Sequence, residues 1–358
     1  MFLKSMDASA HVKDATLLCD LLDRFIQEVG PQHVVQIITD NAANYVAASR
    51  MLMSRYLTLF WTPCAAHCID LILEDLGKID WIKDTIESAR SIKKFMYNHA
   101  AVLSLMRRFT GDKELVRPAI TRFATSFISL QSLLTSMWEL QTMFLSPEWR
   151  DLSFSTRPKG QATFNLVTYR QSFWDAVTKV CTITKPLVKV LRLVDGDKPT
   201  MGYLYEAMDR AKESIRAYYE DNGDQRQERK QMIWGVIDAR WNHTLHRPIH
   251  AAGLYLNPSF SYSYGFRFDA EVMDGFYECV ERMVPSADDC AELSQELEVY
   301  KRGTRLFCFQ MVVHDRTNIM PSKLLIVSNF KFHFLFLSSF FALKFKFHCL
   351  FLCFSNSL

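Results

Sequence analysis

The stretch VVQIITDNAANYVAAS, residues 34–49, decides the fold class of this chain. Its first six residues form a short β-rich run of the kind that buried parallel strands show, and residues 41–56 return to a helical pattern. Asp40 stands at the junction of the two. A carboxylate at the carboxyl end of a parallel strand lies where α/β sheets place their functional sites, because loops and helix N-termini converge there. The order strand, acid, helix therefore predicts an α/β fold with Asp40 as a candidate site residue.

The flanking segments extend this pattern. A helix is predicted from about Val12 to Val29, stopped by Gly30 and Pro31, and TLFWTP at 58–63 reads as the next strand, followed by a helix up to Gly77. Strands that alternate with helices at this spacing predict βα units around a parallel sheet. Beyond Ile79 almost everything up to about residue 304 has a helical pattern. A short strand over 119–126 is the exception that we expect.

The chain therefore divides into three predicted regions. Residues 1–110 form the βα core, residues 111–320 a mainly helical region, and residues 321–358 a tail rich in Phe, Leu and Ser. Within the helical region, 218–231 reads as an exposed connection or frayed helix end, and 245–265 as an ordered, turn-rich crossing between helices. The tail has three explanations: read-through of non-coding sequence, which we favour, a peripheral membrane segment, or a buried β segment.

Composition limits the classes of function. With 358 residues, 49% of them hydrophobic and 23% charged, the chain has the composition of a globular protein. A formal charge of only +3 gives no global basic field, so any surface that binds nucleic acid must be a local patch. The nine cysteines show no framework spacing and no secretory leader is recognisable at the start. Both observations predict reduced thiols rather than disulfides.

Asp40 has two interpretations from its local sequence. Asn41 and Asn44 follow it, and an aspartate that caps the next helix explains the pattern without any metal. The alternative is a metal-binding acid. A single acid does not make a catalytic site, because metal-dependent phosphodiester chemistry uses several oxygen ligands around a pair of ions.

The motif WTPCAAHC at 61–68 follows the second strand. A helix that begins near Cys64 would place Cys64, His67 and Cys68 on one face. A structural zinc site needs four ligands, and no matching second pair lies downstream, so we do not expect zinc. Two interpretations remain: buried cysteines beside a hydrogen-bonded histidine, or a functional histidine close to Asp40.

Several ordered motifs carry a resemblance. Residues 1–79, RPAITRFATSFISLQSL at 117–133, VIDARWNHTLHRPIHAAGLYLNP at 236–258 and ELEVYKRGTRLF at 296–307 resemble the domain-of-unknown-function family 659 of plant hAT-type transposases. The resemblance covers about residues 1–320. It implies a ribonuclease-H-like core interrupted by a large all-α insertion, in which an Asp, Asp, Glu triad holds Mg²⁺ for DNA strand cleavage and transfer.

The resemblance also assigns residues. Asp40 in TDNAAN is similar to the second acid of the triad and would be the metal ligand, and Cys64 and His67 are similar to a Cys-x-x-His motif near the active site. Arg122 in TRFAT is similar to a core arginine that would contact DNA, although Phe123 replaces the usual tryptophan. Trp241 lies in a D-x-R-W element of the insertion, and we expect it to serve in packing.

The departures from the family pattern decide the expected function. The first acid of the family lies upstream of FLKS and the final Glu beyond the insertion, so we expect both to be missing from a chain that begins just before FLKS and whose similarity ends near Met320. Asp7, Asp70, Glu74 and Asp75 are poor replacements, the last three because they read as the solvated face of a helix. The core would then be incomplete, Mg²⁺ would not be bound productively, and the dimerisation segment of the family would be absent.

The leading hypothesis is therefore a transposase-derived nuclear protein without catalysis, with residual binding of DNA or protein and with neither a small-molecule substrate nor a membrane as partner. The alternatives are a metal-dependent DNA-processing enzyme whose missing acids come from another chain or a corrected gene model, and a protein interaction module that uses the helices. Five basic residues could contact phosphates, but on an amphipathic helix such side chains usually form the solvated face; these are Lys83, Lys93, Lys94, Arg107 and Arg108.

Overall fold

The computed structural model describes residues 14–116, 124–196, 200–221, 227–284, 286–316 and 343–344. Its contacts divide the chain into two compact units. The first, which we call the sheet unit, combines Met1–Cys68, Arg192–Asp209 and Ala239–Leu358; the second, the helical unit, combines Ile69–Leu191 and Arg210–Asp238. The division into 1–110, 111–320 and 321–358 stays a prediction.

Both predicted strands are present in the sheet unit. β1 (Gln36–Thr39) and β2 (Phe60–Pro63) pair in parallel, with Gln36 opposite Phe60 and Thr39 opposite Pro63. The helices predicted around them are also confirmed: α1 (Ala15–Val29), α2 (Ala43–Arg55) and α3 (Ala65–Gly77). A two-residue strand, β3 (Leu343–Lys344), pairs with the other side of β1 and gives the sheet order β2-β1-β3. The rest of the tail lies outside the described residues.

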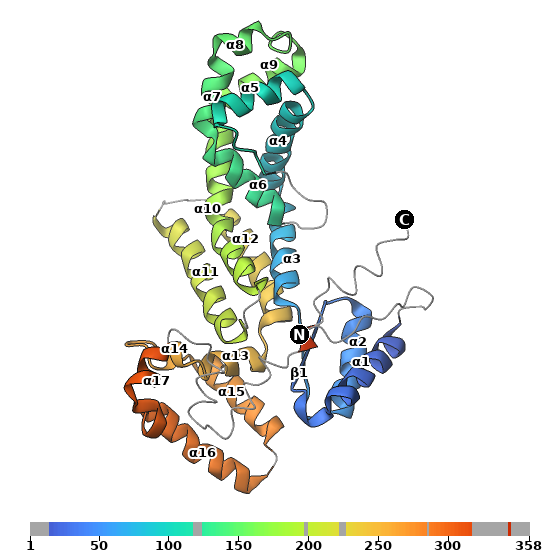
Figure 1. Ribbon diagram of the computed structural model, residues 1–358, viewed down its shortest axis with the longest axis vertical. Coiled ribbons are helices and arrows are strands. Elements are labelled where there is room, and N and C mark those ends of the chain that lie inside the picture. Colours follow the sequence, from blue (N-terminus) through green and yellow to red (C-terminus); the bar gives the residue numbers. More distant parts are fainter. Residues whose placement is uncertain are drawn as a thin grey trace. The chain divides into compact units, whose positions relative to one another are not determined.

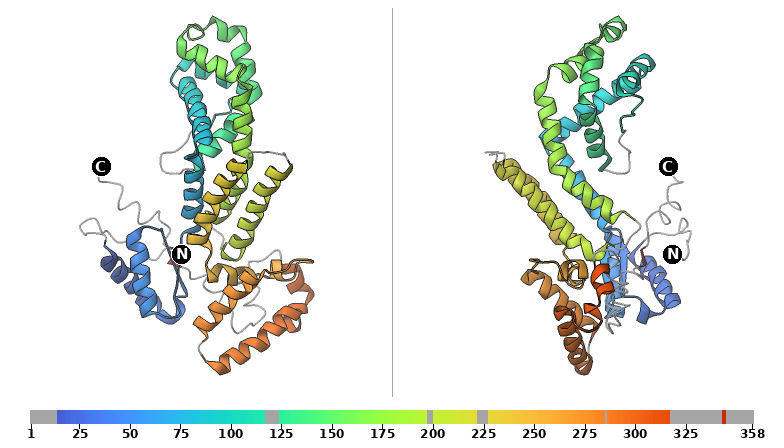
Figure 2. Two further views of the ribbon diagram at one scale, coloured as in Figure 1. Left: turned by 180° about the vertical axis from the view of Figure 1, so that it is seen from behind. Right: turned by 60° about the vertical axis from the view of Figure 1, so that its left-hand side comes forward.

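Helices cover the two faces of this small sheet. Figures 1 and 2 show α1 and α2 on one face and α13 and α15 on the other. Ile37 of β1 packs with residues of α1 and α2, whereas Val35, which precedes β1, and Phe60 of β2 pack with Ile249 and Cys279. Covering helices on both faces is the arrangement that parallel strands require.

The remainder of the sheet unit is helical. The segment 245–265, predicted to be turn-rich, consists mainly of short helices, because Pro248 and Pro258 each occupy the first turn of one, where a missing N–H costs nothing. The elements after residue 240 are a π-helix (Trp241–Leu245), α13 (Pro248–Tyr255), α14 (Pro258–Ser261), α15 (Ala270–Met283), α16 (Ala287–Arg302), a 3₁₀ turn (Arg305–Cys308) and α17 (Gln310–Asp315). A second 3₁₀ turn, Pro31–His33, precedes β1.

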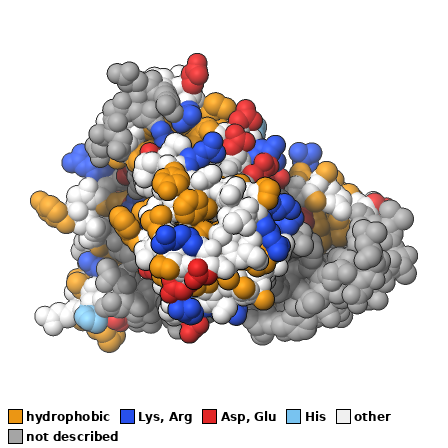
Figure 3. Space-filling model, turned by 90° about the horizontal axis from the view of Figure 1, so that it is seen from above, with side chains coloured by type: hydrophobic (Ala, Val, Ile, Leu, Met, Phe, Trp, Pro, Cys, Tyr) orange, Lys and Arg blue, Asp and Glu red, His pale blue; other side chains and the backbone are white. Residues whose placement is uncertain are grey.

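The helical unit contains long helices and, within its described residues, no strand. Its elements, some of which continue into the sheet unit, are α4 (Asp80–Tyr97), α5 (Ala100–Thr110), α6 (Ala124–Thr135), α7 (Met137–Leu145), α8 (Pro147–Asp151), α9 (Pro158–Thr168), α10 (Gln171–Val194), α11 (Met201–Asp221) and α12 (Gln227–Arg240). Figure 3, viewed from the end at which α8 and α9 lie in Figure 1, shows Lys and Arg side chains interspersed with Asp and Glu. That face carries no field of a single sign.

Two sequence predictions fall on this unit. The strand predicted over 119–126 is wrong for residues 124–126, which open α6, because the Asp70 carboxylate accepts the Ala124 N–H at 2.8 Å and so caps the first turn. Residues 119–123 lie outside the described part of the chain. Of the connection or frayed helix end predicted over 218–231, residues 218–221 end α11 and residues 227–231 begin α12, whereas residues 222–226 lie outside the described part of the chain.

The fold is thus mostly helical with a small parallel sheet, which agrees with the predicted α/β class. Across the described ranges, no helix is both long and apolar enough to cross a membrane. The cysteines outside the tail, which include Cys64 and Cys68, are free thiols.

Candidate functional site

Asp40 lies directly after β1, half-buried, as the sequence predicts. Its Oδ1 accepts the N–H of Ala42 at 3.1 Å, which is an Asx turn. The N-cap of α2 is Ala42, whose side chain forms no capping hydrogen bond. The interpretation of Asp40 as the N-cap is therefore wrong, because Asp40 lies two residues before that position. Burial raises the pKa of the Asp40 carboxyl, against the Ala42 hydrogen bond and the nearby His67, which both lower it.

The strand ends bring the two predicted motifs together. The N–H of Cys64 donates to the carbonyl of Thr39 at 2.6 Å, which fixes the start of α3 beside the end of β1. His67 is exposed and lies close enough to influence the Asp40 carboxyl, whereas Cys64 is half-buried. The fold therefore places Asp40, Cys64 and His67 at one edge of the sheet.

Two further residues border this edge. Tyr45, in the first turn of α2, is buried near Asp40, and its pKa rises to about 12 through burial and the Asp40 charge. Cys68 is fully buried rather than sharing the environment of Cys64 and His67. Burial raises the pKa of the Cys68 thiol to about 12, although a hydrogen bond with Thr244 lowers it. A thiol held in this way is a packing residue rather than a metal ligand or nucleophile.

Of the described residues Asp40, Cys64 and His67 at the strand-end edge, Asp40 is the one with a carboxylate that could bind a metal ion. His67 and Cys64 are its neighbours. In the part of the chain that the structure describes, no group of three or more His, Cys, Asp or Glu is placed to hold a metal ion. Asp70, Glu74 and Asp75 are half-buried rather than solvated, with Asp70 capping α6 and the other two paired with Lys78.

Two other predicted residues have different outcomes. Arg122 lies outside the described residues. Trp241 is 4% exposed and packs against Tyr205 with ring centroids 5.4 Å apart, so its predicted packing role is confirmed.

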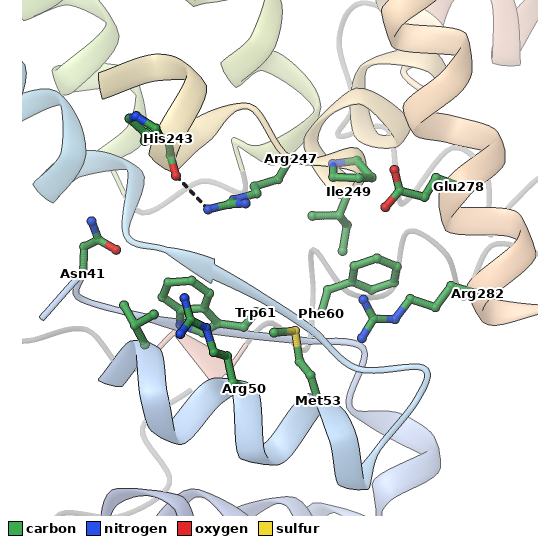
Figure 4. Close-up of a pocket in the computed structure, with 12 residues that line it drawn as sticks. Asn41, Arg50, Met53, Phe60, Trp61, His243, Arg247, Ile249, Glu278 and Arg282 are labelled. Atoms are coloured by element: carbon green, nitrogen blue, oxygen red, sulfur yellow. Dashed lines mark hydrogen bonds between the residues drawn. The ribbon is translucent and has the colours of Figure 1, made fainter. Parts of the chain in front are cut away.

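A pocket of about 380 Å³ runs along β2 (Figure 4). Within the described residues β2 pairs with β1 alone, so its other edge is open and contributes Phe60 and Trp61 to the pocket. Among the charged groups of the lining, three arginines stand against one glutamate. The lining side chains with polar groups are Asn41, Arg50, Trp61, His243, Arg247, Glu278 and Arg282. We call this cavity the arginine pocket.

Each arginine is held differently. Arg282 donates from Nε to the carbonyl of Leu57 and from Nη2 to that of Leu59, both at 2.7 Å, and its guanidinium lies 4.6 Å from the Phe60 ring centroid. Arg247 donates from Nη2 to the His243 carbonyl at 2.7 Å, the bond drawn in Figure 4. Both are therefore fixed in place by neutral carbonyls, and neither forms an ion pair with a residue that the structure describes.

Arg50 completes the set from α2. It is exposed, and among the described residues it makes no ion pair or hydrogen bond. In Figure 4 it rises from α2 while Arg247 reaches in from the segment before α13, with Glu278 and Arg282 at the other end of the pocket on α15. The three guanidinium groups and two aromatic rings provide sites for phosphates and for planar groups.

The sequence did not reveal these arginines as a group. Arg50 reads as an ordinary charge on an amphipathic helix, and Arg247 and Arg282 are separated from it by about two hundred residues of chain. Of the three, Arg247 alone could have been noticed, because HTLHRP at 243–248 lies in one of the segments that resemble the transposase family. Only the fold shows that the arginines line one cavity.

The basic residues that the sequence analysis selected lie in the helical unit. Lys83 and Lys94 are exposed as expected, and Arg107 and Arg108 pair with Glu114 and Glu148. The prediction of a solvated face is wrong for Lys93, which is 3% exposed. Its Nζ donates to the Val116 carbonyl at 2.8 Å and to the carbonyl and hydroxyl of Ser129 at 2.5 and 2.6 Å. Lys93 is a structural residue.

Comparison with known proteins gives one finding. Among curated proteins, none matches the sequence. A family model matches residues 1–92, a stretch that contains α1 to α3, both paired strands and the candidate residues Asp40, Cys64 and His67. This stretch of the chain matches the domain of unknown function DUF659.

Proposed function

We propose that this chain is a nuclear protein derived from hAT-type transposases that binds nucleic acid at the arginine pocket without cutting it. The observation that supports binding is the pocket itself, in which guanidinium groups that form no ion pair with a described residue lie beside two aromatic rings. Arginine forks match phosphate oxygens, and aromatic rings stack on bases. The ribonuclease-H-like origin of the sheet belongs to the same proposal and draws on the parallel strands with an acid after β1.

The proposed lack of cleavage rests on the chemistry of the strand-end edge. Strand transfer needs two metal ions about 4 Å apart, held by several carboxylates. Asp40 alone offers two oxygens, of which one already accepts the Ala42 N–H. Bound Mg²⁺ would take its protein ligand from Asp40 and its other ligands from water, which does not fix a pair of ions.

Arg50→Ala tests the binding. We expect it to lower the affinity for short DNA duplexes or single strands several-fold in a mobility-shift assay, and to reduce the dependence of log K on log salt by roughly one phosphate contact. Arg24→Ala on α1 is the control, because Arg24 is also an exposed arginine of the sheet unit but does not line the pocket. Wild-type affinity that stays constant from about 50 to about 200 mM salt would exclude binding through phosphates.

Asp40→Asn tests the absence of catalysis. We expect neither wild type nor variant to nick supercoiled DNA with Mg²⁺ or Mn²⁺, and both to bind DNA equally, because Asp40 does not line the arginine pocket. The variant should also be slightly more stable at neutral pH, because the fold raises the pKa of this carboxyl and thus disfavours its charged form. Metal-dependent nicking by the wild type that disappears in Asp40→Asn would instead establish a DNA-processing enzyme.

A further inference from the structure

A second pocket of the sheet unit has a lining unlike that of the arginine pocket. Its volume is about 310 Å³, at the small end of the range for small-molecule sites. Four of its residues are aromatic, two are basic and none is acidic. The lining consists of Tyr255, Ser261, Tyr262, Arg267, Phe268, Met273, Tyr300 and Lys301, and we call it the tyrosine pocket.

The rings of this pocket differ in how much of them a ligand can reach. Phe268 and Tyr262 are half-buried, whereas Tyr255 and Tyr300 are almost fully buried. The Arg316 guanidinium already lies 3.8 Å from the Tyr262 ring centroid and so covers one face of that ring. Phe268 contacts Tyr255 and Phe266 with ring centroids 5.0 and 5.3 Å apart, but neither ring stacks parallel to it, so it is the ring with which a planar ligand has most room to stack.

The hydroxyl groups of the tyrosines also differ. Tyr300 donates to the Ser261 Oγ at 2.9 Å, and Tyr262 donates to the Tyr300 carbonyl. Tyr255 is only 3% exposed, and its buried hydroxyl has no hydrogen-bond partner among the described residues. A buried hydroxyl without a partner is unfavourable, and a polar group on a bound ligand would supply one.

The charge at the pocket selects the kind of ligand. Arg267 and Lys301 are both exposed, so they can meet a charged group at the mouth. Among the described residues, Lys301 forms one ion pair, a distant one with Glu298 in which Nζ and Oε1 are 3.9 Å apart. Two cations with no lining acid favour an anion over a cation, and aromatic walls favour a planar ring over an aliphatic chain.

We propose that the tyrosine pocket binds a nucleotide, with the base against Phe268, a polar edge of the base on the Tyr255 hydroxyl and the phosphate at Arg267 and Lys301. A free mononucleotide and a terminal base of a nucleic-acid strand offer the same chemistry. The site is separate from the arginine pocket and shares no lining residue with it. It therefore does not depend on the proposed function.

Titration calorimetry of the full chain with AMP, GMP, CMP and UMP tests this site, with adenosine and inorganic phosphate as partial ligands. We expect saturable binding of at least one monophosphate, and weaker binding of the nucleoside and of phosphate by about tenfold each. A short single-stranded oligonucleotide, titrated into Arg50→Ala, separates the two sources: binding tighter than that of the monophosphate indicates a strand. No saturable binding of any monophosphate overturns the proposal.

Three variants locate the ligand. Phe268→Leu and Tyr255→Phe should each weaken binding about tenfold, and Tyr255→Phe should fold at least as well as wild type because no hydrogen bond is lost. Lys301→Ala should weaken the binding of the monophosphate but not the binding of the nucleoside. Arg302→Ala is its matched control, since Arg302 also pairs with Glu298, at 3.4 Å, but does not line the pocket. Monophosphate binding that all three variants leave unchanged would place the ligand elsewhere and also overturn the proposal.

Discussion

We expect Lys93→Met to lower the free energy of unfolding by about 2 kcal/mol near neutral pH, because it leaves two buried acceptors and one partly buried acceptor without a donor. The three oxygens that lose their partner belong to Val116 and Ser129, and methionine fills the space of the lysine without replacing any bond. Chemical denaturation followed by circular dichroism measures the change. Lys94→Met is the matched control, because Lys94 is the next residue of α4 and is exposed. We expect it to change the free energy of unfolding by no more than about 0.5 kcal/mol.

The size of this loss should depend on pH. Burial lowers the pKa of Lys93 to about 8, whereas in the unfolded chain a lysine titrates near its ordinary value of about 10.4. Between these values the unfolded state binds more protons than the folded state, so the contribution of Lys93 to the unfolding free energy rises with pH. The difference between wild type and Lys93→Met should therefore widen by about 2 kcal/mol from pH 8 to pH 10.

Buried thiols change the unfolding free energy with pH in the opposite direction to Lys93. Wild type and Lys93→Met must therefore be compared with each other at each pH. Burial raises the pKa of Cys68, Cys181 and Cys279 to about 12, so the folded state keeps protons that the unfolded state releases, and stability falls above about pH 8.5. The losses from Cys68 and Cys279 are common to wild type and variant and cancel in their difference. The charge of Lys93 lowers the pKa of the Cys181 thiol, so its removal raises that pKa further and adds to the widening. A difference that narrows with rising pH would mean that Lys93 is held charged.

Arg282→Ala should destabilise the sheet unit by about 2 kcal/mol and reduce binding at the arginine pocket. The variant loses two hydrogen bonds to the carbonyls of Leu57 and Leu59 and the contact with the Phe60 ring. These contacts hold the segment that leads into β2. Arg282→Lys should recover only part of the stability, because one ammonium does not reproduce the two-pronged geometry of the guanidinium.

Glu281→Ala is the control for Arg282, because Glu281 is the preceding residue of α15, is exposed and does not line the pocket. Thermal unfolding and DNA affinity should both stay near wild type in this control. If Arg282→Ala unfolds like wild type, the two carbonyl contacts carry little free energy and β2 is positioned by its pairing with β1 alone.

The sequence allowed good predictions of the local elements around Asp40. A β-rich run, an acid and a helical pattern gave β1 and α2, and Pro63 marked the end of β2, because these features depend on neighbours in the sequence. The environment of Lys93 could not be predicted, because periodicity placed it beside the exposed Lys94 and only the approach of residues 116 and 129 buries it. The turns predicted over 245–265 are largely short helices, because Pro248 and Pro258, which were interpreted as turn residues, each occupy the first turn of a helix.

The residues of the candidate sites also divide into those that the sequence predicts and those that only the tertiary structure brings together. Asp40, Cys64 and His67 could be placed together because parallel strands end at the same edge. The arginine pocket and the tyrosine pocket could not, because each joins residues from elements whose packing is set by the tertiary fold. In physical terms, the residue at which a strand ends depends on its neighbours in the sequence, whereas the convergence of Arg50, Arg247 and Arg282 depends on how α13 and α15 cover the sheet.

The bonds from Arg282 to the segment before β2 join positions that are 225 and 223 residues apart in the chain. Closing so long a loop has an entropic cost that contacts between neighbouring elements do not carry, and the arginine pocket exists only when both ends of the sheet unit have met. A fragment that stops at residue 92 would carry Arg50 and Trp61 but neither Arg247 nor Arg282. A polyanion that contacts Arg50 together with Arg247 and Arg282 would bind the folded sheet unit but not the unfolded chain. By mass action, its binding would raise the melting temperature of the sheet unit as the concentration of the polyanion rises.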